Sequence, residues 1–401
     1  MSRSADRIRN AASPEQSSSG ESDASSVRRK DSRAAGSAGA RSRASTRRPL
    51  HESNVSRPPR PVSADIQLAG AAPRSPALRL SDGCVTKVSS ALACPLQSRR
   101  RPAYSLGVSN SDSQDTGGEV LTGREVPLGG PRAMMVRRTL PGQHRRMIGA
   151  WCFVDAYGPQ RATMRVPPHP HTGLQTVSWL VAGEVLHLDS LGTRQEIRPG
   201  QLNLMTAGHG ISHSEESPET VLHGVQLWVA LPDGHRDVAP GFEHHPSLPV
   251  LAGRGFEARV VMGSLGGVVS PATAYSPLVG AQIAVDGDGE IPLDPAFEHG
   301  LLLLDGTVDG LEPGPLVYLP PGRSRLRVSG RGRLLLIGGE PFAEEIVMWW
   351  NFVGRSHDEI VAFRKEWMEG AGFGTVVGFD GAPLPAPVLP GTRLRPRGRV
   401  R

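Results

Sequence analysis

The chain carries, at residues 169–177, the sequence HPHTGLQTV, in which two histidines are separated by one residue. In a β-strand, residues i and i+2 point to the same face, so His169 and His171 can bind one metal ion from one strand. A second pair with the same spacing, His213 and Glu215, follows in the sequence SHSEE. On two facing strands these pairs supply three imidazoles and one carboxylate, which suits a divalent first-row metal with open positions for water or substrate.

Neither pair is specific by itself, and the plainer interpretation is two surface loops with polar residues. The sequence between the pairs reads as strands and turns, which favours a shared metal site. The chain's three cysteines (Cys84, Cys94 and Cys152) lie outside both pairs, and this disfavours a structural zinc site.

The first 118 residues differ in composition from the rest of the 401-residue chain. They hold 25 Ser, a single aromatic residue (Tyr104), and 19 Lys and Arg against 10 Asp and Glu, a net charge of +9. Such a segment buries too little apolar surface to offset its chain entropy, so we predict a disordered basic tail over 1–118. The remaining residues carry a net charge of −3, so we expect no direct nucleic-acid contact by the folded part.

Several classes of protein are disfavoured by what the sequence lacks. No apolar run approaches the roughly 20 residues that a membrane helix needs, and the start of the chain lacks the apolar core of a secretory signal. Three cysteines in 401 residues do not make a disulfide scaffold and suit a reducing compartment. We therefore expect a cytoplasmic protein without membrane contact. Neither a phosphate-binding G-x-x-x-x-G-K-[ST] loop nor a G-x-S-x-G nucleophile motif occurs.

From about residue 119 onwards, short apolar runs alternate with turns that contain Gly or Pro. Many short strands with such turns predict an all-β, antiparallel sandwich or barrel, of which the jelly roll is one form. The same pattern recurs after residue 240, so we expect two β-units. The predicted strands are 175–181, 185–189, 201–205 and 224–230 in the first unit, and 256–262, 282–285, 300–304, 316–319, 326–328 and 334–337 in the second.

The segment 344–370 is the one strong helix candidate, with an acidic start and three of the six tryptophans. It is interrupted at 354–359, where Ser356 and Glu359 fit a capping box that opens a second helix. We expect these tryptophans to dock the helices on the β-units rather than to bind a ligand. The Pro- and Arg-rich residues 381–401 are expected to be extended.

Other polar residues are weaker site candidates. His187 and Asp189 either orient a metal ligand or are partly exposed strand residues, and the second interpretation is the plainer one. His209 lies in a Gly-rich turn, where it either touches a substrate or is solvated. The pair 244–245 is interpreted as two loop histidines without partners. Cys152, between Trp151 and Phe153, is expected to be a buried structural thiol rather than a nucleophile.

The chain resembles the pirin family of bicupins. The resemblance rests on the two motifs at 169–177 and 205–215, on LHGVQLWV at 222–229, and on the stretch 124–140. The sequence EIVMWWNFVGR at 345–355 is similar to the C-terminal part of bacterial members. Together these stretches extend the resemblance over roughly 119–395 and leave the basic tail outside it.

The resemblance implies two stacked antiparallel β-barrels of the jelly-roll type. It places the N-terminal barrel with its metal site at 119–240, a C-terminal barrel without metal at 241–345, and C-terminal helices with an extension at 346–401. Carried over position by position, the ligands are His169, His171, His213 and Glu215. The C-terminal barrel has no H-x-H motif, and His299 stands alone there.

Two departures from related patterns bear on the site. General cupins place a glutamate four residues after the second histidine, where this chain has Gln175. A neutral amide is a poorer ligand, which agrees with a carboxylate supplied by Glu215. Thr172 replaces the bulky residue that is usual after H-P-H in the family. This difference affects the shape of the entrance and the substrate preference, but not metal binding.

Two functions of different classes follow from the resemblance. The first is a metal-dependent dioxygenase, such as a quercetin 2,3-dioxygenase that opens a flavonol ring with O₂ and releases CO. Glu215 would then act as a ligand and as a base towards the flavonol hydroxyl. The alternative is a non-catalytic, redox-sensitive iron-binding regulator that acts through protein partners. A binding or isomerase cupin with the same ligands is a third reading.

Cofactor and partners follow from the same site. We expect one divalent metal per chain, and Fe(II) is the metal we expect first. Imidazole-rich sites also accept Mn, Ni, Cu or Zn, which are the alternatives. The expected partners are O₂ and a small aromatic or enol-type substrate, with a protein partner under the regulator reading. We expect a monomer and lean towards an enzyme.

Overall fold

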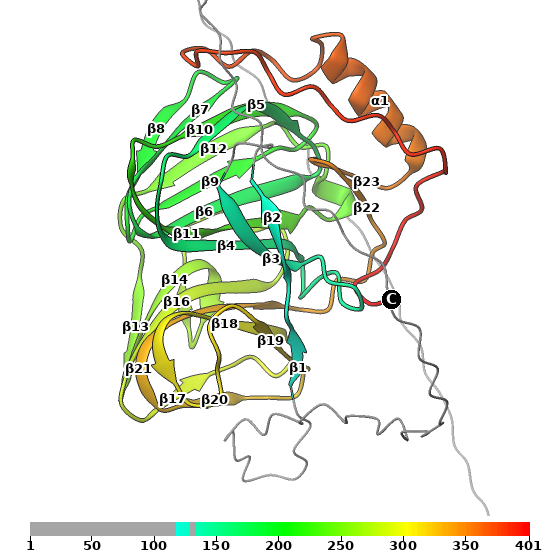
Figure 1. Cartoon of the computed structure of the whole chain (residues 1–401). Coiled ribbons are helices and arrows are strands. Elements are labelled where there is room, and N and C mark those ends of the chain that lie inside the picture. The colour runs from blue at the N-terminus through cyan, green and yellow to red at the C-terminus, as the bar shows by residue number, and fades with distance from the viewer. Residues whose placement is uncertain (1–117, 129–133) are drawn as a thin grey trace, which may run out of the picture. The chain divides into compact units, whose positions relative to one another are not determined.

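A computed structural model of the chain describes residues 118–128 and 134–401 (Figure 1). The predicted disorder of the basic tail lies outside the described residues, apart from position 118. The described part is an all-β bicupin with one α-helix, as expected from the turn pattern. None of the helices in these residues is long and apolar enough to cross a membrane.

The first barrel consists of a seven-stranded and a four-stranded antiparallel sheet. The larger sheet has the order β12-β9-β6-β11-β4-β3-β2, and the smaller one has the order β5-β10-β7-β8. The strands are β2 (Arg124–Pro127), β3 (Met135–Leu140), β4 (Trp151–Ala162), β5 (Arg165–His171), β6 (Leu174–Ala182), β7 (Val185–Asp189), β8 (Arg194–Ile197), β9 (Leu202–Thr206), β10 (Ile211–Glu216), β11 (Thr220–Ala230) and β12 (Gly241–His245), with a short 3₁₀ turn η1 (Asp233–His235) after β11.

The second barrel is built around an eight-stranded sheet and a two-stranded one, β17-β20. The larger sheet has the order β1-β19-β18-β21-β16-β14-β13, with β15 paired to β14. Its first strand comes from the start of the described chain. The strands are β1 (Glu119–Leu121), β13 (Val250–Gly253), β14 (Phe256–Leu265), β15 (Val268–Val269), β16 (Leu278–Asp286), β17 (Gly289–Pro292), β18 (Glu298–Val308), β19 (Leu316–Leu319), β20 (Arg325–Val328) and β21 (Gly330–Gly339).

All ten predicted strands are present, although most extend by one to several residues beyond the predicted bounds. The main core cluster contains side chains from both barrels. Trp151 is fully buried in it, and its indole Nε1 donates to the carbonyls of Val279 and Gly338 at 3.2 and 3.0 Å. A buried carboxylate, Glu298, accepts hydrogen bonds from the backbone N of Gly149 and from Arg399, both at 2.7 Å. Burial and paired polar groups thus join the two barrels.

The helix prediction for the first part of 344–370 is wrong. That part forms a β-hairpin of β22 (Val347–Trp349) and β23 (Phe352–Gly354). The chain reverses between the strands, where Trp350 adopts a φ of 54°, outside the helical region. Apolar β-branched and aromatic residues fit a half-buried pleated surface, and here their packing overrides a helical pattern.

The second predicted helix is present as α1 (His357–Met368). Ser356 is its N-cap, and its Oγ accepts a hydrogen bond from the backbone N of Glu359 at 3.2 Å. The Glu359 carboxylate bonds the backbone N of Arg355 at 2.7 Å instead of that of Ser356, so the capping box is only partly reciprocal. The tryptophans of this region pack around Phe352 and Ile360, in line with a docking role.

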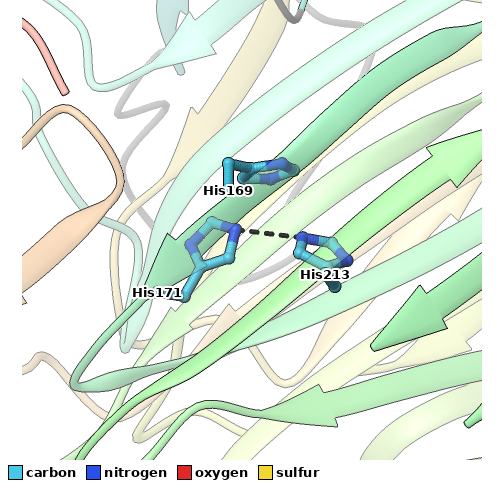
Figure 2. A group of neighbouring side chains, drawn as sticks. All are labelled: His169, His171 and His213. Carbon is cyan, nitrogen blue, oxygen red and sulfur yellow. Dashed lines mark hydrogen bonds between the residues drawn. The ribbon is translucent and has the colours of Figure 1, made fainter. Parts of the chain in front are cut away.

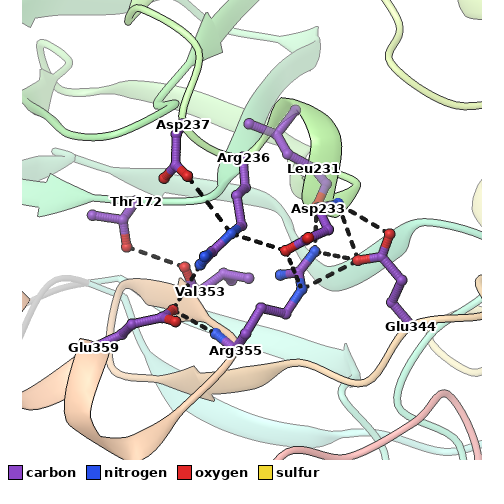
Figure 3. A network of polar contacts seen from close by, with 9 residues as sticks. All are labelled: Thr172, Leu231, Asp233, Arg236, Asp237, Glu344, Val353, Arg355 and Glu359. Carbon is purple, nitrogen blue, oxygen red and sulfur yellow. Dashed lines mark hydrogen bonds and ion pairs between the residues drawn. The ribbon is translucent and has the colours of Figure 1, made fainter.

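A polar network holds the hairpin and α1 against the first barrel (Figure 3). Arg355 donates to the carbonyl of Leu231 at 2.8 Å, and Arg236 pairs with Glu359 at 2.8 Å. The Thr172 hydroxyl donates to the carbonyl of Val353 at 3.2 Å. The hairpin is therefore fixed directly beside the H-x-H strand β5.

Glycine is required where these segments meet. Gly173 follows the H-x-H strand with a φ of 66°, and a Cβ there would lie 2.4 Å from the carbonyl oxygen of Val353. A side chain at this position would separate β23 from the end of β5.

His299 is buried in the second barrel with no exposed surface, and neither ring nitrogen has a hydrogen-bond partner among the described residues. Burial lowers the pKa of this imidazole from 6.5 to about 4, although the charge of Asp294 opposes the shift. The folded protein therefore holds His299 neutral at pH values at which the unfolded chain binds a proton.

This difference predicts a pH-dependent loss of stability. As the pH falls from 6.5 towards 4, the unfolded state gains a proton that the folded state refuses, so the free energy of unfolding decreases. Urea unfolding at pH 7.5 and pH 5 measures the loss in the wild type and in His299→Leu. Between these pH values, the free energy of unfolding of the variant is expected to fall by about 2 kcal/mol less than that of the wild type. An equal loss in both proteins would show that His299 does not titrate in this way.

Candidate metal centre

The H-x-H and H-x-E motifs lie on neighbouring antiparallel strands, β5 and β10, as a shared site requires. His213 is directly opposite His169 in the register of these strands. Figure 2 shows the imidazoles of His169, His171 and His213 converging on one point. The register shifts by one residue between His213 and Glu215, opposite Pro167 and Pro168, which have no N–H to donate to the ladder.

The three imidazoles are close enough to share one ion. A nitrogen of each ring lies within 4.8 Å of the others, and all three side chains are buried. Nε2 of His171 and Nε2 of His213 are 3.1 Å apart. Two ligands at about 2.1 Å from a metal and at roughly right angles lie about 3 Å apart, so this spacing fits a metal site.

Backbone carbonyls set the tautomers of two histidines. Nδ1 of His169 lies 2.9 Å from the carbonyl oxygen of Pro167, and Nδ1 of His171 lies 3.1 Å from that of Asn351. A carbonyl oxygen only accepts, so each Nδ1 carries the proton and donates. Nε2 of both rings is left with a lone pair, the form in which histidine binds a metal.

His213 is oriented by a buried series of hydrogen bonds that runs through His187 and ends at the carboxylate of Asp189. Nε2 of His187 lies 3.1 Å from Oδ2 of Asp189, and Nδ1 of His187 lies 3.3 Å from Nδ1 of His213. Donation from His187 to Asp189 leaves the Nδ1 lone pair of His187 to accept from His213. Nε2 of His213 then also holds a lone pair, which faces that of His171. Two lone pairs at this distance repel one another unless a cation lies near both, so the donor set fits a bound metal.

The position of His187 and Asp189 corrects the plainer interpretation of this pair. Both residues are buried, not partly exposed. Hydrogen bonds from His187 and Thr193 lower the pKa of Asp189 against the opposing effect of burial, so this carboxylate stays ionised. The negative charge of Asp189 stabilises the arrangement in which His187 donates to Asp189 and accepts from His213.

Glu215 does not fall in the group formed by His169, His171 and His213; its carboxylate lies within 4.8 Å of ring nitrogens of His187 and His213. Its carboxylate is buried and accepts a hydrogen bond from the Ser178 hydroxyl at 3.1 Å. Burial raises the pKa of Glu215, whereas His187 and Ser178 lower it in part. A carboxylate that is hard to keep ionised is suited either to bind a cation or to take up a proton.

The histidines are kept neutral by burial. It lowers the pKa of His169 to about 4 and the pKa values of His171 and His213 well below 6.5, and neighbouring imidazoles add to the shift. Neutral imidazole is the metal-binding form. The cluster is therefore ready for a cation at neutral pH.

The three histidines and Glu215 line a pocket of about 660 Å³. The rings of Phe153 and Trp228 stack at 4.0 Å on one wall, and Trp228 meets His171 edge-on at 5.1 Å. Arg138 lies 4.3 Å above Phe153 and is paired with the buried Asp155. The pocket therefore has aromatic side chains in its wall beside the metal-binding nitrogens.

Segments far along the chain complete the pocket. Trp350 and Asn351 of the hairpin and Leu384 of the C-terminal extension line it. The backbone N of Leu384 donates to the carbonyl of Pro168 on β5 at 2.8 Å, and Trp367 donates to the carbonyl of Leu384, also at 2.8 Å. These residues were not predicted to line a site, because a carbonyl or an apolar side chain carries no chemical signature in a single sequence.

The other candidates lie away from the cluster. Gln175 donates from Nε2 to the Thr206 hydroxyl at 3.0 Å and to the carbonyl of Thr273 at 3.1 Å. His209 is exposed. Cys152 is a buried thiol, and burial raises its pKa to about 12, which confirms the structural reading.

The interpretation of 244–245 as loop histidines without partners is wrong. Both residues belong to β12, where His244 bonds Asn203 at 2.7 Å and His245 bonds Glu243 at 3.0 Å. Glu243, the residue before the pair, supplies one of these partners.

Two β-barrels, with a histidine cluster in the first, define the described residues as a bicupin with a candidate metal centre. Comparison with known proteins then identifies the family. The Pirin family model matches residues 133–229, and the model of the Pirin C-terminal cupin domain matches 280–374. The chain belongs to the pirin family.

Individual relatives agree with this assignment. The chain is 48% identical over 288 residues to "Putative quercetin 2,3-dioxygenase PA1205" of Pseudomonas aeruginosa, covering 67% of this chain and 90% of that protein. It is 34% identical to a "Pirin-like protein" of Caulobacter vibrioides, over 59% of this chain and 88% of the relative. A crystal structure titled quercetin 2,3-dioxygenase, from Acinetobacter baumannii, aligns with 43% identity and a TM-score of 0.66, over 70% of this chain and 97% of the other.

The hydrogen bonds that link Asp189, His187 and His213 predict that a change at Asp189 weakens metal binding. In Asp189→Asn the amide oxygen can still accept from the backbone N of Leu191 and Thr193, so an NH₂ group then faces His187. His187 and His213 must shift their protons, which blocks Nε2 of His213 as a ligand. We expect about 10–100-fold weaker Co(II) binding in a chelator competition.

Asp286→Asn is the matched control, because Asp286 is exposed and pairs with Arg331. Its Co(II) affinity should equal that of the wild type. Nitrogen NMR shifts of the imidazoles report the tautomers directly. If His187 and His213 kept their wild-type tautomers in Asp189→Asn, the proposed proton arrangement would be refuted, whatever the Co(II) affinity.

Proposed function

We propose that this pirin-family protein is a metal-dependent dioxygenase whose ion is held by His169, His171, His213 and Glu215. The observation that carries the proposal is the convergence of three imidazole lone pairs at the inner end of an aromatic-lined pocket. Fe(II) is the metal we expect, and imidazole ligands also accept Mn, Ni, Cu or Zn. A bound ferrous ion would supply reactivity with O₂ and lower the pKa of a coordinated hydroxyl.

The walls of the pocket support a flat aromatic substrate of the flavonol type, with quercetin as the candidate. The stacked rings of Phe153 and Trp228 line this pocket, and so does Trp350. The guanidinium of Arg138 covers Phe153 and is held by Asp155 at 2.7 Å, so this wall is fixed. A flat ring system between these walls would reach the nitrogen atoms of the cluster with its edge.

Glu215 is the residue placed to move a proton. It is buried beside His213, and it would accept a proton from a substrate hydroxyl on shifting away from the ion, because burial then raises its pKa. The Ser178 hydroxyl can donate either to Glu215 or to Gln226, at 3.1 and 3.0 Å. The serine can therefore turn to Gln226 when Glu215 becomes protonated.

Oxygen uptake with quercetin tests the activity. The full chain is loaded anaerobically with Fe(II), its metal content is measured, and uptake is followed with an oxygen electrode. We expect metal-dependent uptake in the wild type and none in His171→Ala, which lacks a ligand. His244→Ala, altered at a histidine outside the cluster, should behave like the wild type. One bound metal per chain without uptake would remove quercetin as the substrate and favour a redox-sensitive regulator.

The role of Glu215 is tested separately. In Glu215→Gln, three imidazoles still bind the metal, but no carboxylate takes up the proton, so kcat should fall by about 100-fold or more at saturating Fe(II). Glu216→Gln is the control, because Glu216 pairs with Arg165 at 3.1 Å on the neighbouring strand. Full activity of Glu215→Gln after metal is restored would assign Glu215 a ligand role alone.

A further inference from the structure

A second pocket, of about 750 Å³, lies beside the metal pocket and shares Arg124, Pro141 and Met348 with it. None of the candidate metal ligands lines it. We propose that this arginine pocket binds a small organic phosphate at a site that does not depend on the metal. Its arginines come from three parts of the chain, and they are Arg124, Arg146, Arg393, Arg395, Arg397 and Arg401.

The charge of the arginine pocket is unbalanced. Its described lining contains no Asp or Glu. Arg393 pairs with Asp358 at 2.9 Å, whereas the other five arginines form no ion pair with a carboxylate of the described residues. Arginines nearby differ in this respect, since Arg138 pairs with Asp155 and Arg399 with Glu298, each at 2.7 Å. A cluster of guanidinium groups with no Asp or Glu side chain in its described lining attracts anions.

Repulsion within the pocket supports this reading. Arg146 is half-buried, and burial together with the charges of Arg397 and Arg401 lowers the pKa of its guanidinium. A bound anion would offset the repulsion between these three side chains. Arg395, Arg397 and Arg401 are themselves exposed, so a ligand can reach them from solvent.

Backbone hydrogen bonds hold the arginines in place. The backbone N and O of Arg397 bond O and N of Ile346 at 2.9 and 3.1 Å. The backbone N of Arg146 donates to the carbonyl of Arg399 at 2.7 Å, and that of Arg401 donates to the carbonyl of His144 at 2.9 Å. The pocket is therefore formed before a ligand arrives, and exchange of an arginine side chain leaves these bonds intact.

The lining also indicates the class of ligand. Guanidinium groups bind phosphate oxygens in a planar, two-point geometry. Apolar residues, among them Met147, Val347 and Leu394, line the same pocket and can contact an uncharged ring. A phosphate ester with a ring-shaped body matches both features, and ADP is a suitable probe.

Calorimetric titration of the full-length protein with ADP tests the proposal, with adenosine as the uncharged comparison. We expect one saturable ADP site and no binding of adenosine. In Arg395→Gln/Arg397→Gln the affinity should fall by about tenfold or more, because charged hydrogen bonds are lost. Arg325→Gln/Arg331→Gln removes the same charge from exposed ion pairs of the second barrel and should retain wild-type affinity.

The controls separate this site from other sources of binding. The basic residues 1–117 are the same in all variants, so binding to them would leave Arg395→Gln/Arg397→Gln at wild-type affinity and overturn the proposal. An equal loss in both double variants, or binding of adenosine, would also overturn it. His171→Ala should keep its ADP affinity, and a loss there would place the ADP at the metal centre. These outcomes do not depend on oxygen uptake.

Discussion

The pairing of β5 with β10 is the interaction on which the site depends. Because His213 is opposite His169, these two side chains point to the same side of the small sheet. The spacing of two residues within each motif then places His171 and Glu215 on that side as well. A shift of one residue in this register would turn the ligands of one strand away from those of the other. Pro167 and Pro168 confine the irregularity of the ladder to the side near Glu215.

The sequence was sufficient for the ten predicted strands and for bringing His169, His171 and His213 together, because both depend on periodicity within one segment. It was insufficient for 344–354, where local pattern favoured a helix but Trp350 reverses the chain into a hairpin. It also gave too little weight to His187, since burial and contact with His213 depend on the neighbouring strand. The carbonyl of Asn351 could not be predicted at all, because every residue has one.

Polar groups in the interior serve different purposes in the two barrels. In the first barrel, buried histidines have partners for Nδ1 and keep Nε2 directed towards a common point. In the second barrel, Glu298 joins segments by accepting hydrogen bonds, and His299 packs without a polar partner among the described residues. The same fold therefore holds the candidate metal centre in one unit and buried connecting groups in the other.

The bond from His171 to the carbonyl of Asn351 has a consequence for synthesis on the ribosome. All four motif residues have been synthesised once Glu215 is translated, but the group that fixes the His171 proton is 180 residues beyond His171. Leu384, which bonds β5 and closes the pocket, follows later still. A nascent chain can thus present the donor atoms early, but it finishes their orientation only when translation has passed through the hairpin and the extension.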